Sequence, residues 1–137
     1  MAKHVVKTPQ IEVNGVDLSD HLTDVSLTYE ADEIESTSSG TTVNDKTFIA
    51  GLRSWKVDAT LQQDYDASEV DATLFALVGA DPFSIKVRPT SAVKGATNPS
   101  FEGNAILLSY PPISGAVGEM AKVSVSFRGT GALTRSV

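Results

Sequence analysis

The side chains that could carry out chemistry are few and scattered in this chain of 137 residues. His21 lies in a turn-like stretch without the acid and nucleophile pattern of a catalytic site, so a surface turn residue is favoured over a catalytic base. The densest carboxylates, at residues 30–35, fall in a polar stretch where nothing would raise a pKa for acid catalysis. The absence of cysteine excludes disulfides and thiolate metal sites.

Known metal and phosphate motifs are also missing from the sequence. Asp64 and Asp66 suggest a calcium loop, but the central glycine and terminal glutamate of an EF-hand do not follow. Gly129-Thr130-Gly131 lacks the third glycine and the helix of a dinucleotide-binding turn, and no P-loop, HExxH or GxSxG pattern occurs. We therefore expect no enzyme, no cofactor and no metal ion.

Composition restricts the partners further. The net charge is −6 without a basic stripe, which disfavours sequence-specific nucleic-acid binding. No apolar run reaches the roughly 18 residues of a membrane span, so we expect no membrane contact. Residues 1–71 hold 14 acidic and 5 basic residues, whereas residues 72–137 hold 3 and 6. This asymmetry suits self-assembly between unlike faces, and a solvated acidic loop is the simpler alternative.

One segment has helical spacing. Apolar residues at i, i+4, i+7 and i+8 predict a helix over residues 68–79, with Phe75 widening the apolar stripe. Ser68 is the expected N-cap and Gly79 the expected C′ residue. The core positions of this helix are Val70, Leu74, Leu77 and Val78.

The remaining chain has the alternation of β-strands. Alternating segments occur at residues 24–30, 47–62, 83–88 and 122–128, a more continuous apolar run at 101–110, and a break or bulge is expected at Ala50-Gly51. Asn14-Gly15 predicts a two-residue hairpin turn. The fold class is therefore mainly β, an antiparallel β-sandwich or partly closed barrel with one flanking α-helix. We expect one domain, 1–137, with a flexible N-terminal arm at about 1–9, a long loop at 31–46 and a C-terminal tail at 129–137.

The order of these landmarks resembles the tail tube (major tail) proteins of long, non-contractile-tailed bacteriophages. The resemblance covers nearly the whole chain, and its individual motifs are turn and cap residues. The matching stretches are residues 13–22 with Asn14-Gly15, 31–37, 50–52, 70–74, 77–79, 111–118 beginning Pro111-Pro112, and 130–135 beginning Thr130-Gly131.

The resemblance implies a structural virion protein that forms hexameric rings, assembled in the host bacterial cytoplasm. The rings would stack around a tape-measure protein into a hollow tube for double-stranded DNA. Tail-terminator and baseplate or tail-tip proteins are the further partners that it implies. Such a channel should be acidic or weakly charged, because attraction for phosphates at every ring would slow ejection.

Two sets of residues are candidates for these roles. The channel-lining candidates are Asp24, Ser26, Thr28, Glu30, Asp58, Thr60, Gln62, Ser124 and Ser126. The candidates for contacts between stacked rings are Asp32, Glu33, Glu35, Thr37, Thr42, Asp45 and Lys46.

Two other functions stay open at this point. A monomeric adhesion, carbohydrate-binding or virion-decoration module should expose aromatics on one face, whereas Tyr29, Trp55 and Phe127 occupy inward strand positions. A tail-terminator or neck protein would form one ring that caps the tube instead of extending it.

Overall fold

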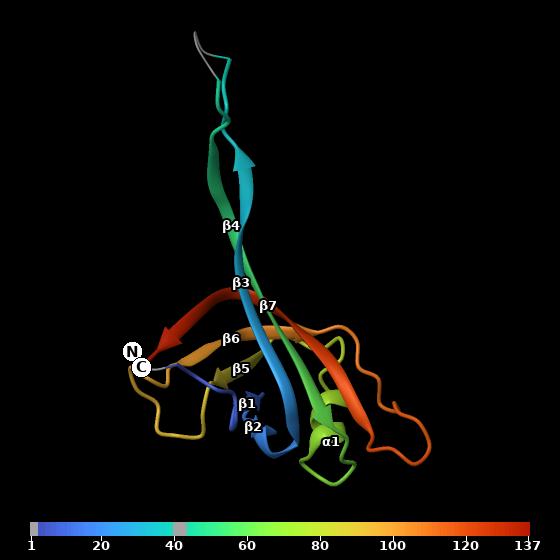
Figure 1. Ribbon diagram of the computed structural model, residues 1–137. Helices are drawn as coiled ribbons and strands as arrows, with labels where there is room; N and C mark the ends of the chain where they lie inside the picture. Colours follow the sequence, from blue (N-terminus) through green and yellow to red (C-terminus); the bar gives the residue numbers. More distant parts are fainter. Residues whose placement is uncertain (1–2, 40–43) are drawn as a thin grey trace.

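A computed structural model describes residues 3–39 and 44–137. Within these ranges the chain is mainly β with one short α-helix, as the alternation predicts. The strands are β1 (Gln10–Val13), β2 (Val16–Asp17), β3 (Leu22–Glu35), β4 (Phe48–Gln62), β5 (Phe83–Arg88), β6 (Ser100–Leu107) and β7 (Lys122–Ser136). They form one antiparallel sheet in the order β2-β1-β5-β6-β7-β4-β3 (Figure 1). The sheet is not closed, because β2 and β3 are its two edges.

The core lies against one face of this curved sheet. In residues 55–61 of β4, in β5 and in residues 123–127 of β7, every second side chain is buried, while the residues between them are more exposed. This period of two places one apolar set on the inner face and one polar set on the outer face. Helix α1 (Val70–Phe75) supplies Val70 and Leu74 to the same core, and Leu77 follows it.

The predicted hairpin between β1 and β2 is confirmed. Asn14 and Gly15 both have positive φ, 49° and 82°, as a two-residue turn of this kind requires. Val13 and Val16 are directly paired across it.

The helix is shorter than its apolar spacing predicts, and four details of the prediction are wrong. Ser68 has a φ of +62° and Glu69 is the N-cap, without a side-chain capping bond. Phe75 is 67% exposed and Val78 42% exposed, so neither belongs to the core. The physical reason is that the helix ends at Phe75, after which Val78 forms an isolated bridge with Leu107 of β6. The predicted C′ position of Gly79 is wrong as well, because Ala76 is the C-cap, although Gly79 has a positive φ of 72°.

Strands β3 and β4 continue past the body of the molecule as a two-stranded projection. We call its described residues, 30–39 and 44–53, the hairpin arm (Figure 1). The predicted loop at 31–46 is therefore wrong for residues 31–35, which pair with β4 as far as Glu35 opposite Phe48. Regular backbone pairing holds them although their side chains are polar. The predicted bulge is confirmed, since the register shifts between Ala31 and Glu33, opposite residues 51 and 52.

The predicted tail at 129–137 is also wrong, because β7 extends to Ser136. Its last part pairs with β6, with Phe101 opposite Arg135 and Ser100 opposite Ser136. Low apolar content led to the prediction of a tail, but strand pairing satisfies the backbone whatever the side chains are. The Trp55 Nε1–H also donates a hydrogen bond to the Gly131 carbonyl oxygen at 3.1 Å.

No helix in the described part of the chain is long and apolar enough to cross a membrane.

Candidate functional site

The predicted channel-lining residues lie together on the outer face of β3, β4 and β7. The register places Asp24 beside Thr60 and Thr60 beside Ser124, and the next row is Ser26, Asp58 and Ser126. Their neighbours along the strands, such as Val57 and Val125, are buried in the core. We call this outer surface of the three strands the polar face.

Hydroxyl groups join the strands across this face. The Thr60 and Ser124 hydroxyls are 3.2 Å apart, and the Thr23 hydroxyl donates to the Thr60 carbonyl oxygen at 3.1 Å. The remaining candidates lie at the ends of the face, with Glu30 opposite Ser54 and Gln62 opposite Lys122. The sequence therefore identified residues that form one contiguous surface.

The polar face also carries basic residues that the candidate set left out. The row beyond Ser26 consists of Thr28, Lys56 and Arg128, and the Lys56 ammonium lies 3.6 Å from the Asp58 carboxylate. Lys122 lies beside Gln62 at the far end. Three acidic side chains, Asp24, Glu30 and Asp58, are thus matched by three basic ones. The alternation placed these basic residues outward, but only the register shows that the row of Lys56 and Arg128 lies between the rows of Glu30 and Asp58.

The hairpin arm carries the candidates for contacts between rings. Asp32, Glu33 and Glu35 belong to β3, while Thr37, Asp45 and Lys46 lie between the strands, and Thr42 lies outside the described residues. The hairpin continues beyond its regular strands. The Ser36 N–H donates to the Thr47 carbonyl oxygen, and the Thr47 N–H donates to the Thr37 hydroxyl oxygen, both at 2.8 Å.

Sequence reasoning missed the apolar side chains of the arm. Ile34 and Ile49 are directly opposite one another, and both are exposed, as are Phe48 and Leu52. Gly51 lies against Ile34, and a methyl group at Gly51 would come within 2.7 Å of the Ile34 Cδ1 atom. The signal was present in the sequence, since Phe48, Ile49 and Leu52 lie in the segment predicted as a strand and Ile34 in the segment predicted as a loop.

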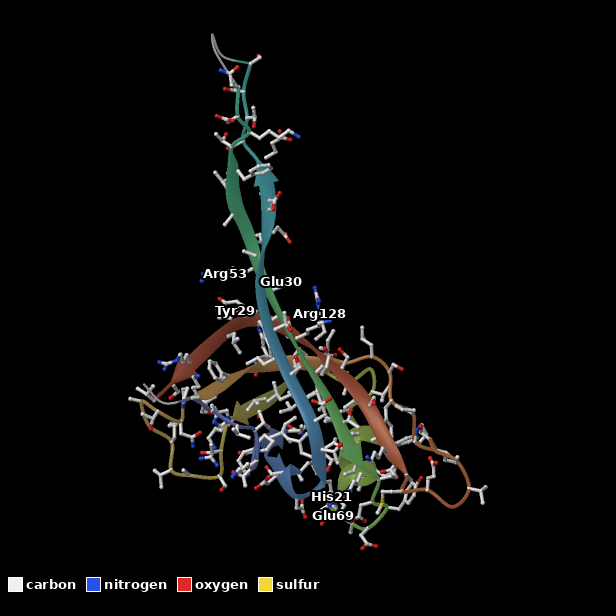
Figure 2. All side chains as sticks on the ribbon, in the orientation of Figure 1. His21, Tyr29, Glu30, Arg53, Glu69 and Arg128 are labelled. Carbon is white, nitrogen blue, oxygen red and sulfur yellow. The ribbon has the colours of Figure 1, made fainter. Side chains whose placement is uncertain are left out.

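At the opposite end of the body, His21 has carboxylate partners that the sequence did not reveal. Its Nε2 atom lies 2.7 Å from the Glu69 carboxylate, 3.5 Å from Asp64 and 3.7 Å from Asp20 (Figure 2). Ligand atoms of Asp20, His21 and Glu69 lie within 4.8 Å of one another. The His21–Glu69 hydrogen bond connects the 3-10 turn η1 (Ser19–His21) to the start of α1. The cluster therefore links two elements of the body.

Tyr110 is the second polar connection at this end. Its hydroxyl donates to the Asp71 carboxylate at 2.9 Å and accepts a hydrogen bond from the Gln63 amide at 2.8 Å. Burial is the main cause that raises the pKa of Tyr110 to about 12, and the hydrogen bond to Asp71 adds to it.

The exposed aromatics do not gather on one face. Tyr29 lies at the base of the hairpin arm (Figure 2), Phe48 on the arm, Tyr65 before the helix and Phe75 at its end. The prediction that Tyr29 is a core residue is wrong, because it is 49% exposed, whereas Trp55 and Phe127 are buried. The exposed aromatics of the described residues thus come from four different segments, whereas a carbohydrate-binding face needs them side by side.

The open antiparallel sheet, with one short helix on its inner side and a long hairpin, defines a tail-tube-like fold. Solved structures with a similar fold include the following three. The tail of an empty gene transfer agent particle, with C6 symmetry, has a TM-score of 0.71 at 14% identity and covers 95% of each chain. The SPP1 tail tube has a TM-score of 0.69 at 12% identity, over 94% of this chain and 76% of that one.

The third structure is the PVC sheath/tube terminator of an extracellular contractile injection system. Its TM-score is 0.74 at 14% identity, over 100% of this chain and 99% of that one. No family model matches the chain, and neither does any curated protein. The likeness therefore lies in the fold, which this chain shares with components of tails and tubes.

Proposed function

We propose that the chain is a tail tube subunit, which forms hexameric rings that stack into the hollow tube of a virion tail. The observation that carries the proposal is the polar face. It continues across β3, β4 and β7 on the side of the sheet opposite the core. The C6 symmetry of the gene transfer agent tail supports six subunits in each ring.

The charge of the polar face suits a conduit for double-stranded DNA. Its three acidic and three basic side chains are interspersed, so the wall presents neither a continuous positive surface that would hold phosphates nor a strongly repelling one. Hydroxyl groups at Thr60, Ser124 and Ser126 keep such a wall hydrated. DNA would pass without sequence-specific contacts.

The hairpin arm is the proposed contact between stacked rings. It projects from the body, and its side chains have no core to pack against (Figure 1). A tape-measure protein inside the tube, and terminator and tail-tip proteins at its ends, would complete the assembly in the bacterial cytoplasm.

Electron microscopy of the concentrated purified protein tests this proposal. The wild-type chain should form hollow filaments, and deletion of residues 37–42 should leave a folded, soluble subunit that does not polymerise. Far-UV circular dichroism is the control for folding. Tubes of wild-type length from the deletion variant would refute the role of the arm.

A second candidate function is a tube terminator, which the likeness to the PVC terminator favours. A terminator would give single closed rings at concentrations where a tube protein gives filaments. A strictly monomeric particle would exclude both functions and favour an adhesion module.

A further inference from the structure

An apolar groove opens between the edge strand β3 and the end of β5. Its volume is about 440 Å³, and its floor includes Leu27 of β3, Phe101 of β6 and Leu133 of β7. Leu27 and Leu133 pack against the core from one side and are only partly buried. Tyr29, at the base of the hairpin arm (Figure 2), also lines the groove.

Two basic side chains border this groove. Arg88 and Arg135 both line it, and neither guanidinium forms an ion pair with a described residue. An occupant that combines apolar side chains with negative charge would therefore fit both the floor and the rim.

The hairpin arm has this combination. Ile34 and Ile49 form an exposed apolar pair, and Leu52 is 83% exposed. Around them the arm carries five acidic and two basic residues in its described part, a net charge of −3. The arm therefore offers exposed apolar side chains in an acidic setting.

The arm cannot fill the groove of its own chain. Tyr29 lines the groove and is also the last residue of β3 before the arm, so Ile34 lies roughly 16 Å further along the same strand. The arm continues away from the body (Figure 1), and its ladder with β4 would have to break for it to fold back. If the arm fills this groove, the groove must belong to another copy of the chain.

We propose that the apolar side chains of the hairpin arm insert into this groove of a second copy of the chain, with arm carboxylates beside Arg88 and Arg135. This inference rests on the proposed function, because it specifies the contact through which subunits of the tube join. It assigns the arm an apolar contact as well as an ionic one.

The N-terminal segment is the competing occupant. Val5 and Val6 are exposed, but Lys3 and Lys7 flank them, so this segment would bring positive charge to a positive rim. Like charges at an interface are unfavourable. Charge therefore favours the hairpin arm.

Cross-linking in assembled tubes tests the contact directly, since the chain has no cysteine of its own. A double variant, Ile49→Cys with Leu133→Cys, treated with a short bismaleimide, should give a ladder of covalent oligomers beyond the dimer on a denaturing gel. Each single variant should stop at the dimer. The matched control pairs Ile49→Cys with Val117→Cys, at a fully exposed loop residue away from the groove, and should not give a ladder.

The possible outcomes separate the two proposals. Tubes without an arm–groove ladder would overturn this inference and leave the tube function standing. A ladder from Val5→Cys with Leu133→Cys in its place would assign the groove to the N-terminal segment. Absence of any polymer from the wild-type chain would overturn the proposed function and this contact with it.

A charge reversal provides a second measurement if the cysteine variants fold poorly. Arg135→Glu should reduce the pelleted tube fraction by about tenfold or more, because like charges then face each other at the contact. Lys94→Glu, at an exposed loop residue outside both the polar face and the groove, should pellet like the wild type. Equal pelleting of Arg135→Glu and the wild type would contradict the contact.

Discussion

The two halves of β4 differ although they belong to one strand and share one partner, β3. From Trp55 to Leu61, buried side chains alternate with half-exposed ones, whereas residues 48–53 have no buried side chain. Residues 55–61 pack against the core, which includes α1 and β5, whereas residues 48–53 have only β3 beside them.

Residues 55–61 of β4 therefore stabilise the fold, whereas residues 48–53 expose side chains to which a partner could bind. Strand pairing satisfies the backbone of both halves, but pairing alone does not bury Ile49, which stays 57% exposed. Apolar side chains that gather on the surface of one molecule mark a site of interaction. The body therefore specifies the fold, and the hairpin arm carries the surface for which a partner is expected. The following experiments test this distinction.

The largest effect is expected from a cavity in the body. Leu74→Ala removes a fully buried side chain and should lower the free energy of unfolding by about 2–5 kcal/mol. Ile49→Ala, in the arm, should change it by no more than about 0.5 kcal/mol. Urea denaturation followed by tryptophan fluorescence measures both variants. Equal destabilisation would show that the arm contributes to the folded body of the isolated chain.

A smaller loss is expected where the backbone of β7 approaches Trp55. The Trp55 ring lies directly over Gly129, so a methyl group there would overlap the ring. Gly129→Ala should cost about 1–3 kcal/mol, because the ring or the strand must move. Gly95→Ala, with open space around it, is the matched control. Thermal unfolding should distinguish the two, and identical midpoints would contradict the packing of Trp55 against β7.

Assembly should depend on salt, whereas folding of the body should not. The arm has a net charge of −3 in its described part, and Arg88 and Arg135 border the groove. Raising the salt shortens the Debye length from about 30 Å at 0.01 M to about 3 Å at 1 M. The yield or length of tubes should fall severalfold by sedimentation and microscopy. If the yield of tubes did not change with salt, the contact between the hairpin arm and the groove would have only its apolar component.

The smallest effect belongs to Tyr110. Because folding raises its pKa to about 12, the folded state favours the neutral phenol. Its contribution to stability is complete below pH of about 10, the ordinary pKa of tyrosine, and is lost as the pH rises toward 12. In an absorbance titration of phenolate formation, one of the three tyrosines should ionise near pH 12, and Tyr110→Phe should remove that phase. A wild-type titration without this late phase would contradict the burial of Tyr110.

Much of the fold could be predicted because period-two alternation is local. It correctly placed Val57, Ala59 and Leu61 inward and Asp58 and Thr60 outward. It could not predict the end of α1, since the tertiary bridge between Val78 and Leu107 competes with continuation of the helix. Nor could it predict β7 beyond Arg128, where pairing with β6 and the Trp55–Gly131 hydrogen bond hold a segment of low apolar content.

The candidate surfaces could likewise be predicted only in part from the sequence. Alternation identified the polar positions of three separate strands, but only the order β7-β4-β3 and its register make them one surface with matched charges. The groove was beyond sequence reasoning. Its walls come from β3, β5, β6 and β7, which are far apart in the chain, and no local pattern encodes which strands meet.

The sequence by itself determined a mainly β chain, the inner and outer faces of its central strands, the turn at Asn14-Gly15 and an asymmetric distribution of charge. These depend on side-chain period and backbone preference, which act between near neighbours. Only the tertiary structure decided that residues 31–35 and 129–136 are strands, that the arm stands clear of the core, and that an apolar groove with a basic rim remains open beside β3. Those features follow from pairing and packing between distant segments, whose free energy depends on the whole sheet.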